Sequence, residues 1–166
     1  MTQQATEPLD AIAVPRGEGE ARWWFGQLAV IKATGEATGG AYTLVEITVA
    51  PGYRTPLHVH HREDEGFWVL DGHATFTVGE ETIEAPAGTY LFGPRDVPHW
   101  WAAGPDGARV LYLFTPAGIE GLIEDMSVPA QTLTPPPRDL APPRNAPEIA
   151  RQYGCEILPM RVDTPR

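Results

Sequence analysis

Three of the five histidines in this chain lie within four residues, and a carboxylate follows them closely. His58 and His60 are two residues apart, which on a β-strand places both imidazoles on one face. If the segment 62–64 reverses the chain, Glu65 can face the same space, and His99 begins a later strand-like segment. Such a set can supply nitrogen and oxygen ligands to Fe, Mn, Co, Ni, Cu or Zn and leave positions open for a substrate or O₂.

The histidine pattern also has a simpler interpretation, because a His-x-His sequence can be the polar end of a strand. His61 points away from the face that His58 and His60 share, so we expect it to be a solvated neighbour and not a ligand. His73 follows a turn-like glycine, and we expect it to be an exposed residue at the start of a strand. Only the flanking sequence favours the metal-site interpretation over the simpler one.

The elements that must position these residues are strands. Short runs rich in β-branched and aromatic residues alternate with Gly, Pro and Asp, as is typical of an all-β sandwich or barrel. Hairpin turns are predicted at Asp71-Gly72 and Gly79-Glu80. The predicted strands cover residues 22–33, 41–49, 57–60, 66–70, 74–78, 81–84, 89–92, 99–102 and 109–115.

The composition limits the class of protein. A chain of 166 residues fits one domain, and its net charge of −10 disfavours binding to nucleic acid. The single cysteine, Cys155, excludes an intramolecular disulfide. No apolar run is long enough to span a membrane, and the first residues lack the basic start and apolar run of a signal peptide. We therefore expect a cytoplasmic protein that does not bind membranes.

The last quarter of the sequence differs from the rest, because nine of the 18 prolines lie in residues 129–166. Proline removes a backbone donor and restricts φ, so residues 128–144 are predicted to form an extended strap. Short helices are expected at 118–126 and after Asn145, which has Glu148 three residues on. We divide the chain into an N-terminal extension at residues 1–20, a barrel at 21–116 and a tail at 117–166.

The spacing of these residues resembles the two motifs of the cupin superfamily. The first motif is a glycine, five residues, His-x-His, three or four residues, Glu, six residues and a glycine; Gly52, His58, His60, Glu65 and Gly72 meet these spacings. The second motif pairs a Pro-x-Gly turn with a later Pro-His; Pro86, Gly88, Pro98 and His99 match it. Two positions depart from the pattern: Gly79 is one residue further away than usual, and Ala103 stands where asparagine is common. Neither is a ligand position.

The resemblance implies an all-β cupin jelly-roll barrel, a double-stranded β-helix, with a short helical, Pro-rich tail. It also implies one divalent transition metal, held by His58, His60, Glu65 and His99. Thiol dioxygenases of the superfamily usually lack the glutamate, its sugar-nucleotide epimerases generally lack the ligands, and its oxalate-degrading enzymes mostly carry two cupin domains. The chain thus resembles small single-domain cupins of the quercetin 2,3-dioxygenase-like group.

That group implies an enzyme that oxidatively cleaves an enolic, flavonol-like small molecule with O₂, and Glu65 is the expected base. One alternative is a non-oxidative isomerase, cyclase or decarboxylase of natural-product metabolism that uses the same base. Another is a small-molecule-binding cupin without activity. A homodimer is also expected, because an edge strand such as 22–33 needs covering.

Strand alternation predicts the wall of the substrate pocket, although each wall residue alone is more often part of a core. The predicted wall comprises Arg54, Phe67, Val69, Phe92, Trp101, Tyr112 and Phe114. Such a wall is mostly apolar and aromatic, which suits a flat hydrophobic ligand. Trp23 and Trp24 are adjacent, so one is expected to face the barrel and the other a partner subunit or the strap.

Overall fold

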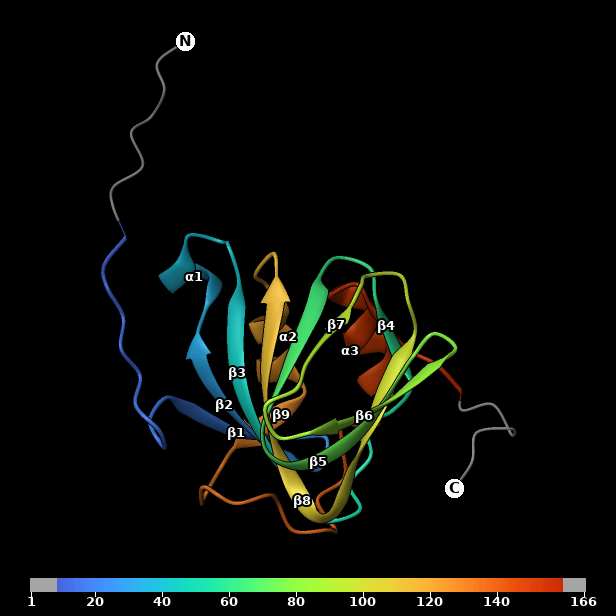
Figure 1. Cartoon of the computed structure of the whole chain (residues 1–166). Helices are drawn as coiled ribbons and strands as arrows, with labels where there is room; N and C mark the ends of the chain where they lie inside the picture. The colour runs from blue at the N-terminus through green and yellow to red at the C-terminus, as the bar shows by residue number, and fades with distance from the viewer. Residues whose placement is uncertain (1–8, 160–166) are drawn as a thin grey trace.

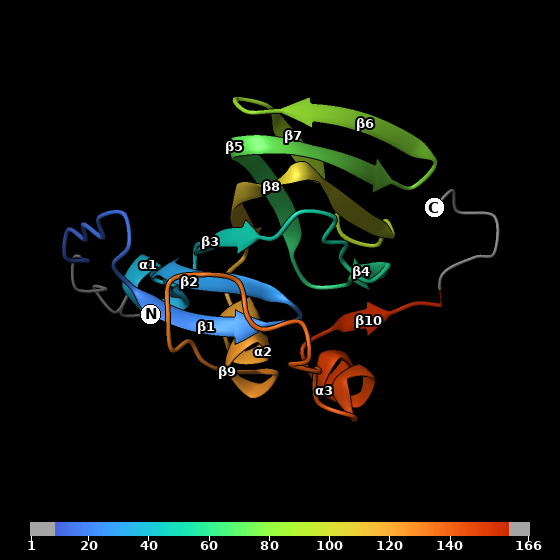
Figure 2. The ribbon, with the colours of Figure 1, turned by 90° about the horizontal axis from the view of Figure 1, so that it is seen from below.

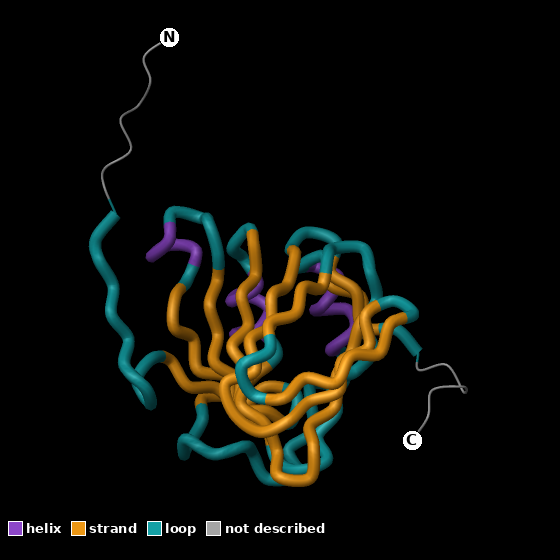
Figure 3. Tube along the Cα trace, viewed as in Figure 1, coloured by secondary structure: helices purple, strands orange, loops and turns teal. Residues whose placement is uncertain are grey.

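The computed structural model describes residues 9–159, so parts of the expected N-terminal extension and tail lie outside the described residues. The described part is an antiparallel jelly roll with few helices, which confirms the predicted fold class (Figures 1 and 3). Its strands are β1 (Glu20–Trp24), β2 (Gln27–Ala33), β3 (Thr43–Val49), β4 (His58–His60), β5 (Asp64–Val78), β6 (Glu81–Pro86), β7 (Tyr90–Gly93), β8 (His99–Thr115), β9 (Ser127–Pro129) and β10 (Cys155–Ile157). The helices are α1 (Gly35–Thr38), α2 (Ile119–Asp125) and α3 (Ala146–Gln152).

The sheet order explains how one end of the barrel collects residues from distant parts of the chain. One path runs β10-β4-β8-β3-β2-β1-β9, and β5 pairs with β6, β7 and β8. Figure 2 shows β5 and β6 on one side of the molecule, and β1 and β2 on the other with α2 and α3 beside them. The long strands β5 and β8 pair with each other, and so join β6 and β7 to the path that contains β3 and β4.

The core follows the two-residue period of the strands. In β3, Val45, Ile47 and Val49 are buried, whereas the residues between them are half-buried. Across the ladder, Val45 pairs with Tyr112 and Ile47 pairs with Val110, both buried residues of β8. The alternation therefore packs the inner side chains of neighbouring strands into one layer.

The predicted strand at 22–33 is two strands joined by a tight turn. Phe25 and Gly26 both have positive φ, 49° and 79°, as in a type I′ hairpin, and Trp24 pairs with Gln27. Phenylalanine is not a typical turn residue, so this hairpin could not be predicted from local turn chemistry. The edge of β1 that does not pair with β2 pairs with β9 of the same chain. This edge therefore does not by itself require a partner subunit.

The predicted hairpin turn at Asp71-Gly72 is wrong, because β5 continues through it. The pairing of β5 with β8 is instead irregular at this point. Gly72 pairs with Ala108 and Ala74 with Ala103, so residues 104–107 of β8 form a bulge without partners in β5. The segments predicted at 99–102 and 109–115 both belong to β8. The turn at Gly79-Glu80 is confirmed, since Val78 pairs with Glu81.

The tail packs along the barrel and adds β9 and β10 to the sheet. The predicted strap lacks helix and strand over residues 130–144. Trp23 donates its Nε1–H to the Thr134 carbonyl at 2.9 Å, while Trp24 is buried; this confirms the predicted division between the two tryptophans. Asn145 precedes α3, but its side chain makes no capping hydrogen bond. No helix within residues 9–159 is long and apolar enough to cross a membrane.

Candidate metal centre and its cavity

Four potential ligands converge at one end of the barrel. His58 and His60 lie on β4, Glu65 on β5, and His99 is the first residue of β8. One ligating atom from each of these residues lies within 4.8 Å of the others. The pairing of His58 with His99 brings β4 and β8 together at this point, and Glu65 pairs with Phe114 further along β8. The structure thus brings together the four residues that the spacing singled out.

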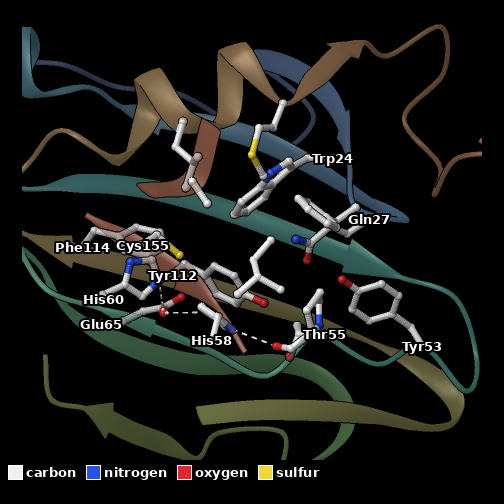
Figure 4. Close-up of a pocket in the computed structure, with 16 residues that line it drawn as sticks. Trp24, Gln27, Tyr53, Thr55, His58, His60, Glu65, Tyr112, Phe114 and Cys155 are labelled. Atoms are coloured by element: carbon white, nitrogen blue, oxygen red, sulfur yellow. Dashed lines mark hydrogen bonds and ion pairs between the residues drawn. The ribbon is translucent and has the colours of Figure 1, made fainter. Parts of the chain in front are cut away.

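A single carboxylate oxygen faces three imidazoles, of which Figure 4 shows those of His58 and His60. Glu65 Oε2 lies 3.0 Å from His99 Nε2 and 3.4 Å from His60 Nε2. The same oxygen lies 4.0 Å from His58 Nε2. Each imidazole therefore turns its Nε2 atom toward the centre of the cluster.

The outer nitrogens of two of these histidines are held by backbone carbonyls. His58 Nδ1 lies 2.9 Å from the Pro56 carbonyl, and His99 Nδ1 lies 3.0 Å from the Val97 carbonyl. A carbonyl only accepts, so Nδ1 carries the proton in both rings. In the neutral imidazole, Nε2 then presents its lone pair to the cluster, as a metal ligand must.

Burial and the neighbouring charges set the protonation of the cluster. Burial, and then the nearby His99 and His60, lower the pKa of His58 to about 3. Burial also opposes a charge on His60, but the carboxylates of Glu63 and Glu65 outweigh it and raise the pKa of His60 to about 9. Burial would raise the pKa of Glu65, but the neighbouring His60 and His99 side chains lower it to about 2. At neutral pH Glu65 is therefore ionised beside a protonated His60, and a metal ion that binds His60 has to displace that proton.

The donor set fits a divalent transition metal. Three imidazole nitrogens and one carboxylate oxygen are ligands that such ions accept, and metal–ligand bonds of about 2.0–2.2 Å bring ligand atoms to about 3–4 Å from one another. The separations in the cluster lie close to this range, so small side-chain movements suffice. His61 stands apart: its side chain is about half exposed and hydrogen-bonds Asp96. His73 is likewise at the surface, beside Glu84.

A cavity of about 50 Å³ begins at this cluster and runs under the tail. At the ligand end it is lined by His58, His60, Glu65, Tyr112 and Phe114. Aromatic and polar side chains from the β1–β2 hairpin and the loop before β4 line the rest: Trp24, Phe25, Gln27, Tyr53 and Thr55. The tail supplies Leu122, Met126, Ala150, Cys155 and Ile157.

The predicted wall residues divide between the cavity and the core. Tyr112 and Phe114 line the cavity. Phe67, Val69 and Trp101 do not; they are buried in the core behind the site. Phe67 lies with its ring centroid 5.8 Å from that of His99, so it packs against a cluster residue without lining the cavity.

Two predicted wall residues lie elsewhere. Phe92 is 53% exposed on the outer face of β7, whose inward residues are Leu91 and Gly93, so the predicted parity was off by one residue. The Arg54 guanidinium stacks 3.7 Å from the ring centroid of Trp100 and does not line the cavity. The prediction missed Gln27, Thr55 and the residues of the tail. The spacing of Ile119, Leu122, Ile123 and Met126 marks an apolar face on α2, but the local sequence does not indicate which strands this face covers.

Comparisons with known proteins agree with this architecture. The cupin domain family model matches residues 45–114. Quercetin 2,3-dioxygenase of Bacillus subtilis (strain 168) is 39% identical over 84 residues, which are 50% of this chain and 25% of that enzyme. Dimethylsulfoniopropionate lyase DddW of Ruegeria pomeroyi is 32% identical over 104 residues, 63% of this chain and 64% of the lyase. The chain thus spans a quarter of the length of one relative and less than two thirds of the other.

The fold also matches a solved cupin. The crystal structure of an RmlC-like cupin from Shewanella frigidimarina aligns with a TM-score of 0.57 and 20% identity, over 67% of this chain and 96% of that one. An identity this low supports the fold alone. The family model matched at residues 45–114, the 39% identity to the dioxygenase segment and the four converging motif residues support a small protein of the cupin superfamily.

Proposed function

We propose that this protein is a metal-dependent enzyme that oxidatively cleaves an enolic aromatic molecule, such as a flavonol, with Glu65 as the base. The observation that carries the proposal is the position of Glu65 Oε2, 3.0–4.0 Å from three imidazole nitrogens at the end of a largely apolar cavity. The similarity to quercetin 2,3-dioxygenase supports the oxidative reaction.

The histidines and Glu65 have distinct roles in this proposal. His58, His60 and His99, with Glu65, would hold one divalent metal of the Fe, Mn, Co, Ni, Cu or Zn group. A bound metal would supply a Lewis acid that lowers the pKa of a neighbouring hydroxyl. Glu65 has a pKa of about 2 and is ionised at neutral pH, so it is free to accept a proton but is a weak base. Proton transfer to Glu65 Oε2 therefore depends on a substrate hydroxyl whose own pKa is lowered in the site.

The small volume of the cavity means that a flavonol requires side-chain movement in order to bind. About 50 Å³ is well below the roughly 300–1,000 Å³ of ordinary ligand pockets. A flavonol would therefore enter only if side chains on the tail side, such as Leu122 and Met126, move outward. Tyr112 and Phe114 would remain as an aromatic wall that keeps water from the Glu65 carboxylate.

A non-oxidative reaction is the second candidate. The similarity to the dimethylsulfoniopropionate lyase covers more of this chain than the similarity to the dioxygenase does, and a small cavity suits a small substrate. Glu65 would again remove a proton, and a carbon–heteroatom bond would break without O₂.

Elemental analysis followed by O₂-electrode assays distinguishes these functions. We expect one divalent transition metal per chain and O₂ consumption with quercetin. Glu65→Gln should lower kcat by about 100-fold or more, because a general base contributes roughly that factor. Glu84→Gln, a change at an exposed carboxylate, is the matched control and should retain full activity. Turnover of an enolisable substrate without O₂ uptake would favour the lyase-type reaction, and no turnover would favour a binding protein.

A further inference from the structure

Three side chains at the far end of the cavity carry a polar atom without a hydrogen-bond partner in the described part of the chain. Trp24 Nε1, Gln27 Oε1 and the Tyr53 hydroxyl oxygen are buried, and none makes a hydrogen bond within residues 9–159. Trp24 and Gln27 are only 9% and 3% exposed, and all three residues line the cavity. In Figure 4, Gln27 and Tyr53 lie at the end opposite to His60 and Glu65, with Trp24 on the adjoining wall.

The local fold holds these groups in place. Trp24 and Gln27 are the paired residues that flank the Phe25-Gly26 turn, so the hairpin fixes their spacing. The Tyr53 ring lies over Gly26, where a Cβ would come within 3.2 Å of the tyrosine Cε2. Tyr53 also packs edge-on against Trp101, with ring centroids 5.8 Å apart.

The absence of partners is costly. A buried donor or acceptor that is left unsatisfied costs about 1–3 kcal/mol, and native structures hold few of them. Three such groups in one cavity wall are therefore available to hydrogen-bond a molecule inside the cavity.

The chemistry of the three groups defines that molecule. An indole N–H only donates, a phenol donates and accepts, and an amide does both through separate atoms. Burial raises the pKa of Tyr53, so its hydroxyl stays neutral and can donate. None of the described lining residues is Lys or Arg, so this end does not neutralise an anion. The groups match a neutral hydroxyl or carbonyl at the end of an apolar body.

We propose that Trp24, Gln27 and Tyr53 form a hydrogen-bonding subsite that selects ligands with a neutral hydroxyl or carbonyl remote from the His–Glu cluster. The inference rests on the proposed function only in treating this cavity as the place where the substrate binds. It adds a recognition element at the opposite end from Glu65.

Phenol and toluene are matched probes, since they have similar shape and only phenol carries a hydroxyl. Binding to the full chain is followed in ¹H–¹⁵N spectra, where Trp24→Phe assigns the Trp24 indole resonance among the five tryptophans. Both ligands can shift that resonance through their ring currents, but phenol should shift it further, because only phenol accepts a hydrogen bond from the indole N–H. The ratio of phenol to toluene affinity should fall about five- to tenfold in Tyr53→Phe, as expected for one lost hydrogen bond. Gln27→Leu should lower the same ratio.

Tyr153→Phe is the control, because its hydroxyl bonds Asp125 outside the cavity; the affinity ratio should not change. An unchanged ratio in both Tyr53→Phe and Gln27→Leu would overturn the subsite and leave ordered water as the partner of these groups. A Trp24 resonance that phenol moves no further than toluene does would overturn it as well. If the ratio responds as expected but no flavonol supports O₂ uptake, the dioxygenase proposal fails and the subsite stands.

Discussion

The Nδ1 atom of His60 lies 3.6 Å from Glu63 Oε2, and both atoms are buried without a hydrogen-bond partner within residues 9–159. The other two histidines of the cluster direct Nδ1 to a backbone carbonyl, so Glu63 takes that place for His60. A carboxylate behind a histidine orients the ring and strengthens its lone pair. We therefore expect Glu63→Gln to weaken divalent metal binding about 10- to 100-fold, measured by competition with a chelator.

The control for this variant is Glu84→Gln, which removes a carboxylate 3.1 Å from the surface residue His73. It should bind metal as the wild type does. Equal affinity in Glu63→Gln and wild type would show that Glu63 does not position His60.

Metal removal should destabilise the folded chain. An ion that binds only the folded state stabilises it in proportion to RT ln(1 + [L]/Kd), which is about 2.7 kcal/mol at 100 times Kd. A chelator should therefore lower the Tm of the loaded protein by several degrees in a thermal melt. His99→Ala should abolish the metal-dependent difference, whereas His73→Ala should preserve it because His73 is at the surface. A difference that persists in His99→Ala would place the ion elsewhere.

Gly72 should tolerate no side chain. Its φ is +78°, and a Cβ would lie 2.4 Å from the Gly107 carbonyl oxygen of the paired strand. Gly40 has a similar φ of +82° but open space around it, so Gly40→Ala measures the backbone strain alone, about 1–2 kcal/mol. Gly72→Ala should lose about 1–3 kcal/mol more in urea unfolding. If both variants lose the same unfolding free energy, β5 and β8 move apart at Gly72 and Gly107 at little cost.

Glu120 should contribute stability that depends on pH. Its carboxylate accepts hydrogen bonds from the Gly35 and Gly118 amides and from the Thr43 hydroxyl, and so connects the start of α2 to α1 and β3. Burial would raise the pKa of Glu120, but these hydrogen bonds outweigh it and hold the pKa below the ordinary 4.5. Glu120→Gln should cost about 1 kcal/mol of unfolding free energy at pH 7, since the group is partly exposed.

The sign of the pH effect follows from the lowered pKa. The carboxylate stabilises the fold fully above pH 4.5, and this contribution is lost as the pH falls through the pKa of the folded state. The difference between wild type and Glu120→Gln should therefore shrink in acid. Glu124→Gln, on the exposed side of α2, should show no comparable difference at either pH. A constant gap across the pH range would exclude the ionised form as the stabilising one.

The four cluster residues could be predicted because their positions follow from local rules. His58 and His60 share a face by strand alternation, and the motif spacing added Glu65 and His99. Alternation failed for Phe92 because the parity of a four-residue strand depends on where pairing begins. The tail wall could not be predicted, since Leu122 and Ile157 reach the cavity through contacts with strands far away in the sequence.

The pairing of β10 with β4 has a consequence for the order of events during synthesis. Cys155 pairs with His60, and Ile157 with His58, so the outer edge of the ligand-bearing strand is covered by residues almost 100 positions later. A nascent chain that has passed Thr115 holds all four cluster residues, but β4 then has an open edge and the cavity lacks its tail wall. Contacts between segments so distant in the sequence form late in folding. We therefore expect the four cluster residues to be more accessible to ions before β10 pairs with β4 than afterwards.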